Sequence, residues 1–223
     1  MTSGSAHDEV VWLRPEHSEV GRPARHTRSA ITEVAVRIGD ERGLAAVTMR
    51  EVAAALGTAA GSLYRHVTGR DELVDLMADH VAAEYDLRAP TGAWLEDLTG
   101  LATQGLAIHR RHAWLADVVT TPIPGPHGLA LTEHWLAVLA DHPAGDSEKL
   151  VAFAVTNALL GAFGRTGHGR DPARSRAQTA YVSKVIAQGR HPRLAALRPE
   201  GPIDPEQVFP EVVRRTLRGL LGG

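Results

Sequence analysis

Apolar residues recur every three or four positions along nearly the whole chain, which is the period of an amphipathic α-helix. From about residue 27 to residue 42 this pattern places Ile31, Val34 and Ile38 on one face, and Gly43 ends the segment. No stretch shows sustained alternation with period two, so the sequence predicts an all-α fold. Segments rich in Pro and Gly separate further predicted helices near residues 93–110, 112–119, 127–141, 147–164, 173–188 and 206–221.

The segment from Thr48 to Arg70 contains two short helices with one tight turn between them. Thr48 and Glu51 have the spacing of a capping box, so a helix is expected to begin here. Gly57 can close that helix in a left-handed conformation, and Thr58 can cap the next one. Two short helices across a tight turn are typical of a DNA-binding helix-turn-helix, whose second helix enters the major groove.

A fourth helix is predicted to open near Thr68 and to end before Pro90. Leu73, Leu76 and Met77 give it an apolar face at helical spacing. A helix of this length can leave one domain and enter the next, so we expect it to join two domains.

The charge of the chain is distributed unevenly. Residues 21–70 carry eight arginines and four acidic residues, whereas residues 71–223 carry fifteen Lys or Arg and eighteen acidic residues. Positive charge therefore gathers around the helix-turn-helix, where a phosphate backbone would be met. A few surplus arginines are also common on small helical domains, so the charge alone does not decide the function.

The chain has no cysteine, which excludes disulfides and thiolate metal sites. Its first twenty residues carry several charges and lack an apolar run, so we expect no signal peptide. The longest nearly apolar segment, residues 150–164, is shorter than the roughly 20 residues that cross a bilayer. The sequence therefore predicts a cytoplasmic protein with no membrane partner.

The motif LGTAAGSLYRHVTGRDEL, preceded by GLAAVTMREVA, resembles the amino-terminal DNA-binding domain of the TetR family of bacterial transcriptional regulators. RRHAWL, followed by a Pro-Gly-rich turn, resembles the ligand-binding half of repressors close to the tetracycline repressor. VVWLRPEHSEVGRPAR is similar to the lead-in of some actinobacterial members. The resemblance implies a flexible basic arm over residues 1–26, a three-helix helix-turn-helix domain over 27–72, and a helical ligand-binding and dimerisation domain over 73–223.

The resemblance also implies particular DNA contacts. It gives Arg50 a bidentate contact to guanine, and it gives Tyr64 and His66 phosphate contacts that fix the register. Core packing of Tyr64, and plain solvation of Arg65 and His66, stay open as alternatives. The residues predicted at the DNA are Arg22, Thr48, Arg50, Ala60, Gly61, Ser62, Tyr64, Arg65, His66 and Arg70.

The amino-terminal arm contains the short basic sequence Gly21-Arg22-Pro23. Proline limits its flexibility, so Arg22 is a candidate for entering a narrow minor groove. The alternative is a disordered tether that adds only nonspecific attraction.

A ligand pocket in the second domain requires apolar walls and a few placed polar groups. His109 and His112 lie three residues apart and could share a metal ion, but no third ligand is nearby in sequence, so no metal or other cofactor is predicted. The predicted pocket residues are Trp94, His109, His112, Trp114, Trp135, Phe153, Asn157 and Phe163.

A homodimer is expected because two-fold proteins gain specificity from two half-sites. By resemblance, the helices near 147–164 and 206–221 form a four-helix interface with their partner copies, although residues 150–164 could instead be internal core. Pro210 cannot donate a backbone hydrogen bond, so the last helix is predicted to begin or kink there. The predicted interface residues are Val151, Val155, Ala158, Leu159, Ala162, Val213, Leu217 and Leu220.

These features predict a ligand-responsive repressor that binds operator DNA and is released by a small apolar or aromatic molecule. An enzyme or small-molecule carrier with a helical pocket is the alternative, and an architectural DNA-binding protein is a third possibility. The chain lacks a phosphate-binding glycine loop, a GxSxG motif, a cysteine nucleophile and an HExxH motif, which argues against an enzyme.

Overall fold

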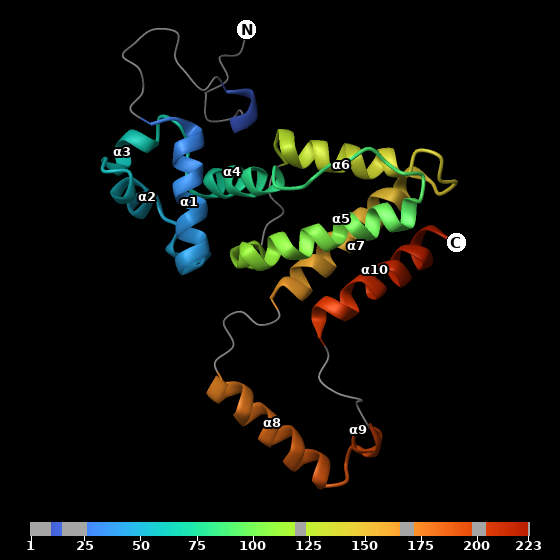
Figure 1. Cartoon of the computed structure of the whole chain (residues 1–223). Coiled ribbons are helices and arrows are strands. Elements are labelled where there is room, and N and C mark those ends of the chain that lie inside the picture. Colours follow the sequence, from blue (N-terminus) through green and yellow to red (C-terminus); the bar gives the residue numbers. More distant parts are fainter. Residues whose placement is uncertain (1–9, 15–25, 119–123, 166–171, 198–203, 223) are drawn as a thin grey trace, which may run out of the picture.

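The computed structural model of the chain describes residues 10–14, 26–118, 124–165, 172–197 and 204–222. These ranges contain ten α-helices, three short 3-10 helices and no strand (Figure 1). The predicted all-α fold is thus confirmed. The helices are α1 (Arg28–Arg42), α2 (Met49–Ala55), α3 (Ala60–Leu63), α4 (Arg70–Ala82), α5 (Trp94–Arg111), α6 (Pro126–Val138), α7 (Asp146–Gly164), α8 (Pro172–Ala187), α9 (Pro192–Ala196) and α10 (Pro205–Leu221).

The helix-turn-helix forms where the sequence predicts it, with small differences in capping. Thr48 Oγ1 accepts a hydrogen bond from the Glu51 amide, and Gly57 closes the turn with a φ of 64°. Only half of the capping box forms, because the Glu51 carboxylate pairs with Arg42 instead. The predicted Thr58 cap is wrong, since Ala59 precedes α3 and makes no side-chain capping bond.

The first core fills the space between α1, α2, α3 and α4. Ile31, Leu63, Val67 and Leu73 are at most 1% exposed within it. The inner face of α4 belongs to this core as far as Val81. This helix runs from Arg70 to Ala82 and so ends before Pro90, as predicted.

The second core lies between α5, α7 and α10, which pack against one another and run side by side in Figure 1. Leu98, Phe209 and Leu217 are fully buried in it. Of the two predicted outcomes, a helix start or a kink at Pro210, the start is wrong, because Asp204 caps the helix and α10 continues through Pro210.

Helices α8 and α9 pack chiefly against each other, and Figure 1 shows them set apart from the other helices. The sequence did not predict α9. Exposed apolar side chains on this α8–α9 arm are Tyr181, Val182, Leu194 and Leu197.

Residues 10–14 depart from the predicted flexible arm. Val11, in the 3-10 helix η1 (Val11–Leu13), is only 2% exposed. Arg28 Nη1 donates to the Val11 and Arg14 carbonyls, and Arg14 forms an ion pair with Glu72 on α4. This short segment therefore packs onto the first domain. Arg22 lies outside the described residues.

Candidate DNA-binding surface and ligand cavity

The helix-turn-helix presents three large polar side chains to solvent. Arg50 on α2, and Tyr64 and Arg65 after α3, are all exposed. Tyr64 is 54% exposed, so the alternative that it packs in the core is wrong. His66 is partly buried beside them. A phenol and two guanidinium groups on one helix-turn-helix can meet phosphates and guanine edges.

The small residues of α3 offer few groups for base contacts. Ala60 packs partly against the first core, whereas Gly61 is exposed and has open space where a side chain would lie. The Ser62 hydroxyl donates to the Ala59 carbonyl at 2.7 Å. Gly61 therefore permits close approach of a DNA strand, but the side-chain donors must come from elsewhere.

Two predicted DNA residues have structural partners within the domain. Arg70 Nε donates to the Val47 carbonyl at 3.1 Å and Nη2 donates to the Leu44 carbonyl at 2.9 Å. These bonds tie the start of α4 to the loop before α2. The Thr48 hydroxyl caps α2, as described above. A DNA contact by either side chain stays a prediction.

The second domain contains a narrow cavity, partly open to solvent, with about 10 Å³ of free volume. Three of the predicted pocket residues line it, namely Trp135, Phe153 and Asn157. The Trp135 and Phe153 rings meet edge to face at 5.3 Å, and Trp135 Nε1 donates to the Lys149 carbonyl. The remaining lining residues are Tyr85, Leu101, Ala102, Leu131, Thr156 and Leu160.

Tyr85 supplies a polar group to this otherwise mostly apolar cavity. Burial raises the pKa of its hydroxyl far above the ordinary value, so the phenol stays neutral. Gly105 faces the Tyr85 hydroxyl so closely that a side chain at residue 105 would collide with it. Among the described residues, no hydrogen bond engages the Tyr85 hydroxyl. The hydroxyl is thus available to a ligand.

Two predicted pocket aromatics lie outside the cavity. Trp94 packs edge to face on His142 with ring centroids 4.7 Å apart, and Phe163 packs on Phe209 at 5.2 Å. Both side chains cover the second core instead of lining the cavity, because α5 and α7 turn these positions toward other helices.

Trp114 and His112, also predicted in the pocket, lie instead at the junction of the two domains. Trp114 is 1% exposed in the first core, and its ring covers Gly39, where a Cβ would lie 2.9 Å from Trp114 Cδ1. His112 Nδ1 bonds to the Asp40 carboxylate at 2.7 Å and Nε2 to the Glu84 carboxylate at 2.8 Å. Trp114 Nε1 also donates to Asp40, at 2.8 Å. We call these four side chains, Asp40, Glu84, His112 and Trp114, the junction cluster.

His109 faces another environment. Its Nδ1 bonds to the Gly105 carbonyl at 3.0 Å, and burial lowers the pKa of the imidazole, opposed by that hydrogen bond and assisted by nearby His112. Because both His112 nitrogens are engaged by carboxylates, the two imidazoles do not face a shared metal position. Within the described residues, no group of three His, Cys, Asp or Glu side chains is placed so that it could hold a metal ion.

A second link between the domains joins α4 to the start of α6. Asp79 on α4 is 6% exposed, and its Oδ1 accepts from the Gly128 amide at 2.8 Å. Its Oδ2 lies 2.9 Å from His127 Nδ1. Helix α6 also carries Leu131 and Trp135, which line the cavity. The Asp79 clamp therefore connects the cavity wall to the helix that begins at Arg70.

The predicted dimer residues divide into two groups. On α7, Val151, Ala158 and Ala162 are exposed, while Val155 and Leu159 are partly exposed, as is Leu220 on α10. Val213 and Leu217, in contrast, are fully buried in the second core of the same chain. Their assignment to the interface is therefore corrected, because the α10 stripe faces α5 and α7.

Several residues at these sites were not predicted to be there. They are Tyr85 at the cavity, Asp40 and Glu84 in the junction cluster, and Asp79 on α4. A signal did exist for Asp79, since a carboxylate at an inward position of an amphipathic helix needs a partner. No local pattern marks Asp40, because its partner His112 lies 72 residues away.

Two family models match the chain. "Bacterial regulatory proteins, tetR family" matches residues 31–77, and "Tetracyclin repressor-like, C-terminal domain" matches residues 88–222. The HTH-type transcriptional repressor DrrR1 of Streptomyces coeruleorubidus is 33% identical over 202 residues, which cover 85% of this chain and 75% of that protein.

Solved structures of ActR from Streptomyces coelicolor are similar as well. Apo ActR superposes with a TM-score of 0.75 at 27% identity, covering 88% of this chain and 97% of that one. ActR in complex with actinorhodin superposes with a TM-score of 0.74 at 27% identity, covering 89% and 96%. Among the described residues of this chain, none of the helices has the length and apolar character to span a membrane.

Proposed function

This chain belongs to the TetR family of bacterial regulatory proteins, and from that membership we propose a repressor released from its operator by a small apolar or aromatic molecule. It is a DNA-binding transcriptional regulator and not an enzyme. The proposed operator is palindromic, and the proposed binding form is a homodimer.

The observation that carries the DNA-binding proposal is the exposed group of Arg50, Tyr64 and Arg65 on a helix-turn-helix. Arg50 has the fork geometry that reads guanine, and Tyr64 has a hydroxyl that can meet a phosphate. Arg50 would therefore carry sequence preference, whereas Tyr64 would carry affinity for any duplex.

The test is binding to a duplex selected from a random pool, measured over a series of salt concentrations. The logarithm of the binding constant should fall linearly with the logarithm of salt, because neutralised phosphates release counterions. Arg50→Ala should flatten preference at one base pair per half-site by about 1–3 kcal/mol, and Tyr64→Ala should weaken all sequences alike. Equal loss on selected and random duplexes would remove Arg50 from base readout.

The cavity supports an apolar or aromatic inducer. Trp135 and Phe153 give it aromatic walls, and Tyr85 and Asn157 give it two polar groups. Its free volume of about 10 Å³ is far below the roughly 300–1,000 Å³ of typical ligand sites, so side chains must move for a ligand to enter. ActR binds actinorhodin in a solved complex, which makes actinorhodin a suitable first probe. A probe that binds should raise the melting temperature and lower operator affinity together.

We propose that ligand binding is coupled to DNA affinity through α6 and α4. A ligand against Trp135 bears on α6, and the Asp79 clamp passes a shift of α6 to α4. Arg70, at the start of α4, is hydrogen-bonded to the loop before α2, so a shift of α4 would also move the helix-turn-helix. A ligand can shift DNA affinity only through such differential contacts with two arrangements.

The exposed apolar face of α7 supports the homodimer. Val151 is 50% exposed, and Ala158 and Ala162 continue the same exposed side beside α10. The α8–α9 arm adds further apolar surface for a second copy of the chain. Adjoining exposed apolar side chains are typical of protein–protein contact surfaces.

Ala158→Asp tests the dimer without touching the internal core. It should shift the sedimentation coefficient toward that of a monomer at micromolar concentration, while Ala130→Asp on an exposed position of α6 should not. Leu217→Asp is unsuitable for this purpose, since it would unfold the second core. A dimer that persists in the Ala158→Asp variant would place the interface elsewhere.

A further inference from the structure

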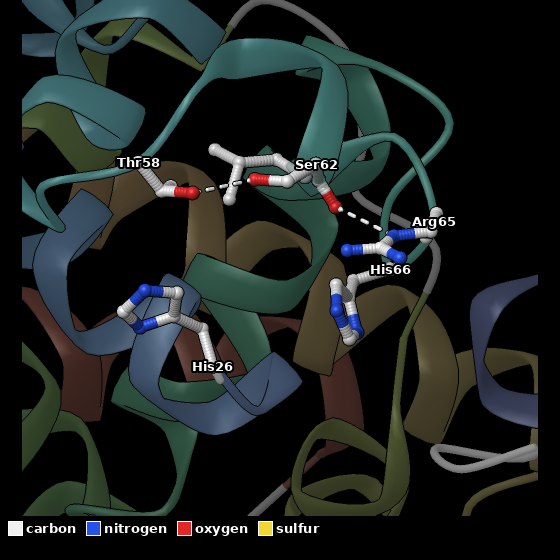
Figure 2. A pocket seen from close by; sticks show the side chains of 6 residues that line it. His26, Thr58, Ser62, Arg65 and His66 are labelled. Atoms are coloured by element: carbon white, nitrogen blue, oxygen red, sulfur yellow. Dashed lines mark hydrogen bonds between the residues drawn. The ribbon is translucent and has the colours of Figure 1, made fainter. Parts of the chain in front are cut away.

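A polar hollow lies between α3 and the residue that precedes the cap of α1. It is open to solvent and has a free volume of about 40 Å³. Figure 2 shows the side chains that line it. Two imidazoles and one guanidinium surround it, and no carboxylate is among its lining side chains. The lining residues are His26, Thr58, Ser62, Leu63, Arg65 and His66.

His26 is the part of this hollow that the helix-turn-helix pattern does not cover. It stands just before the Thr27 cap of α1, outside the predicted DNA-contacting residues. Its Nε2 is shielded from solvent and, in the part of the chain that the structure describes, has no hydrogen-bond partner. A shielded polar nitrogen without a partner costs free energy, so its presence calls for an explanation.

The hydroxyls of the hollow have no hydrogen left to donate. Ser62 donates to the Ala59 carbonyl at 2.7 Å, so Thr58 must be the donor in the 2.8 Å bond between the two hydroxyls. Arg65 Nε makes one long bond of 3.5 Å to the Ser62 carbonyl, and among the described residues no other bond engages its guanidinium. Donors for an incoming group therefore come from His26 and Arg65, with His66 beside them.

We propose that this hollow receives a backbone phosphate of the operator, with His26 donating from the start of α1 and Arg65 from the end of α3. This inference rests on the proposed DNA-binding function. A phosphodiester oxygen only accepts hydrogen bonds and carries negative charge, which matches a lining with N–H donors and no carboxylate. A phosphate held from both sides would fix the position of α1 as well as α3 on the duplex.

His26→Phe removes the ring nitrogens but keeps a planar ring of similar size. It should weaken binding to the selected operator and to random duplex by the same factor, about 3–10-fold, because a phosphate contact carries no sequence information. His26→Gln keeps a neutral N–H donor and should recover part of the loss. His191→Phe on the exposed α8–α9 arm is the matched control and should bind like the wild type.

A methylphosphonate scan identifies the contact directly. Each operator phosphate is replaced in turn by a neutral methylphosphonate, and binding of the wild type and of His26→Phe is compared. One position per half-site should weaken the wild type several-fold yet add little in His26→Phe, because the two changes remove the same contact. If every position weakens both proteins equally, or if His26→Phe binds like the wild type, the proposal is overturned.

Two further outcomes distinguish this proposal from a free-anion site and from a failure of the proposed function. If inorganic phosphate alone shifts the His26 ring signals in NMR spectra while no methylphosphonate position depends on His26, the hollow takes a free anion and the proposal fails. If the wild type binds no selected duplex at all, the proposed function fails with it. A wild type that binds normally beside an unaffected His26→Phe variant overturns only the phosphate contact.

Discussion

The junction cluster and the ligand cavity are both built from aromatic and polar side chains around α5, but they differ in how far those groups are satisfied. At the junction, both ring nitrogens of His112 and the indole nitrogen of Trp114 are hydrogen-bonded to carboxylate oxygens. In the cavity, the hydroxyl of the partly buried Tyr85 makes no hydrogen bond to any described residue.

This difference indicates two roles for the aromatic residues: those at the junction hold the structure together, and those at the cavity can bind a ligand. Satisfied groups and close packing hold one arrangement, since any shift breaks hydrogen bonds in a shielded site. In a cavity whose hydroxyl has no protein partner, an entering ligand can add a hydrogen bond and apolar contacts. We therefore expect substitutions at the junction to change stability, and substitutions at the cavity to change ligand response.

The largest effect is expected from Trp114→Ala. The indole is 1% exposed and covers Gly39, so its removal should lower the free energy of unfolding by about 3–5 kcal/mol. Trp94→Ala is the control, because Trp94 is partly exposed at the edge of the second core and should cost less. Urea unfolding measures both. Equal losses for the two variants would contradict the special contribution of the junction cluster to stability.

Helix ends, which depend on residues within one turn, could be predicted from the sequence better than contacts between residues far apart in the chain. Gly43, Gly57 and Thr48 end or begin helices through rules that act within one turn, and the structure has them in those roles. The same locality explains the recognition of the helix-turn-helix. The start of α10 is not at Pro210, because the Asp204 cap six residues earlier outweighs the one backbone hydrogen bond that Pro210 cannot donate.

The sites depended on contacts that no local pattern encodes. Trp114 and Trp135 are both buried indoles, yet one covers α1 and the other lines the cavity. Helical periodicity gives α10 an apolar stripe, but it does not say whether Leu217 faces its own core or a second copy. Only the packing of α5, α7 and α10 decides that.

The next largest effect concerns the link between the two regions. Asp79→Asn keeps an acceptor for the Gly128 amide but weakens the bond to His127. Operator affinity without ligand should stay within about 3-fold, while the loss of affinity caused by a compound found to release the operator should shrink by about 1–2 kcal/mol, a large part of a typical coupling energy. Asp86→Asn, whose carboxylate pairs with Arg88, is the control. An unchanged ligand effect in Asp79→Asn would mean that the signal bypasses α6.

At the cavity itself, Tyr85→Phe should leave stability unchanged within about 0.5 kcal/mol, since the hydroxyl has no partner to lose among the described residues. Binding of a probe that accepts a hydrogen bond should weaken by about 0.5–1.5 kcal/mol in calorimetry. Tyr181→Phe on the exposed arm controls for a general effect of removing a phenol. A large loss of stability in Tyr85→Phe would make this residue a part of the core instead of a ligand contact.

The smallest effect is expected from His109, which lies on α5 between the two regions. Burial lowers the pKa of its imidazole below the ordinary value of about 6.5, so below that pH the unfolded chain binds a proton that the folded chain refuses. The contribution of His109 to stability is thus unchanged above about pH 6.5 and is lost as pH falls. His109→Gln, which cannot titrate, should therefore show a shallower decline in urea-unfolding free energy between pH 7 and about pH 5 than the wild type or His191→Gln. Parallel curves for all three proteins would show that folding does not perturb this imidazole.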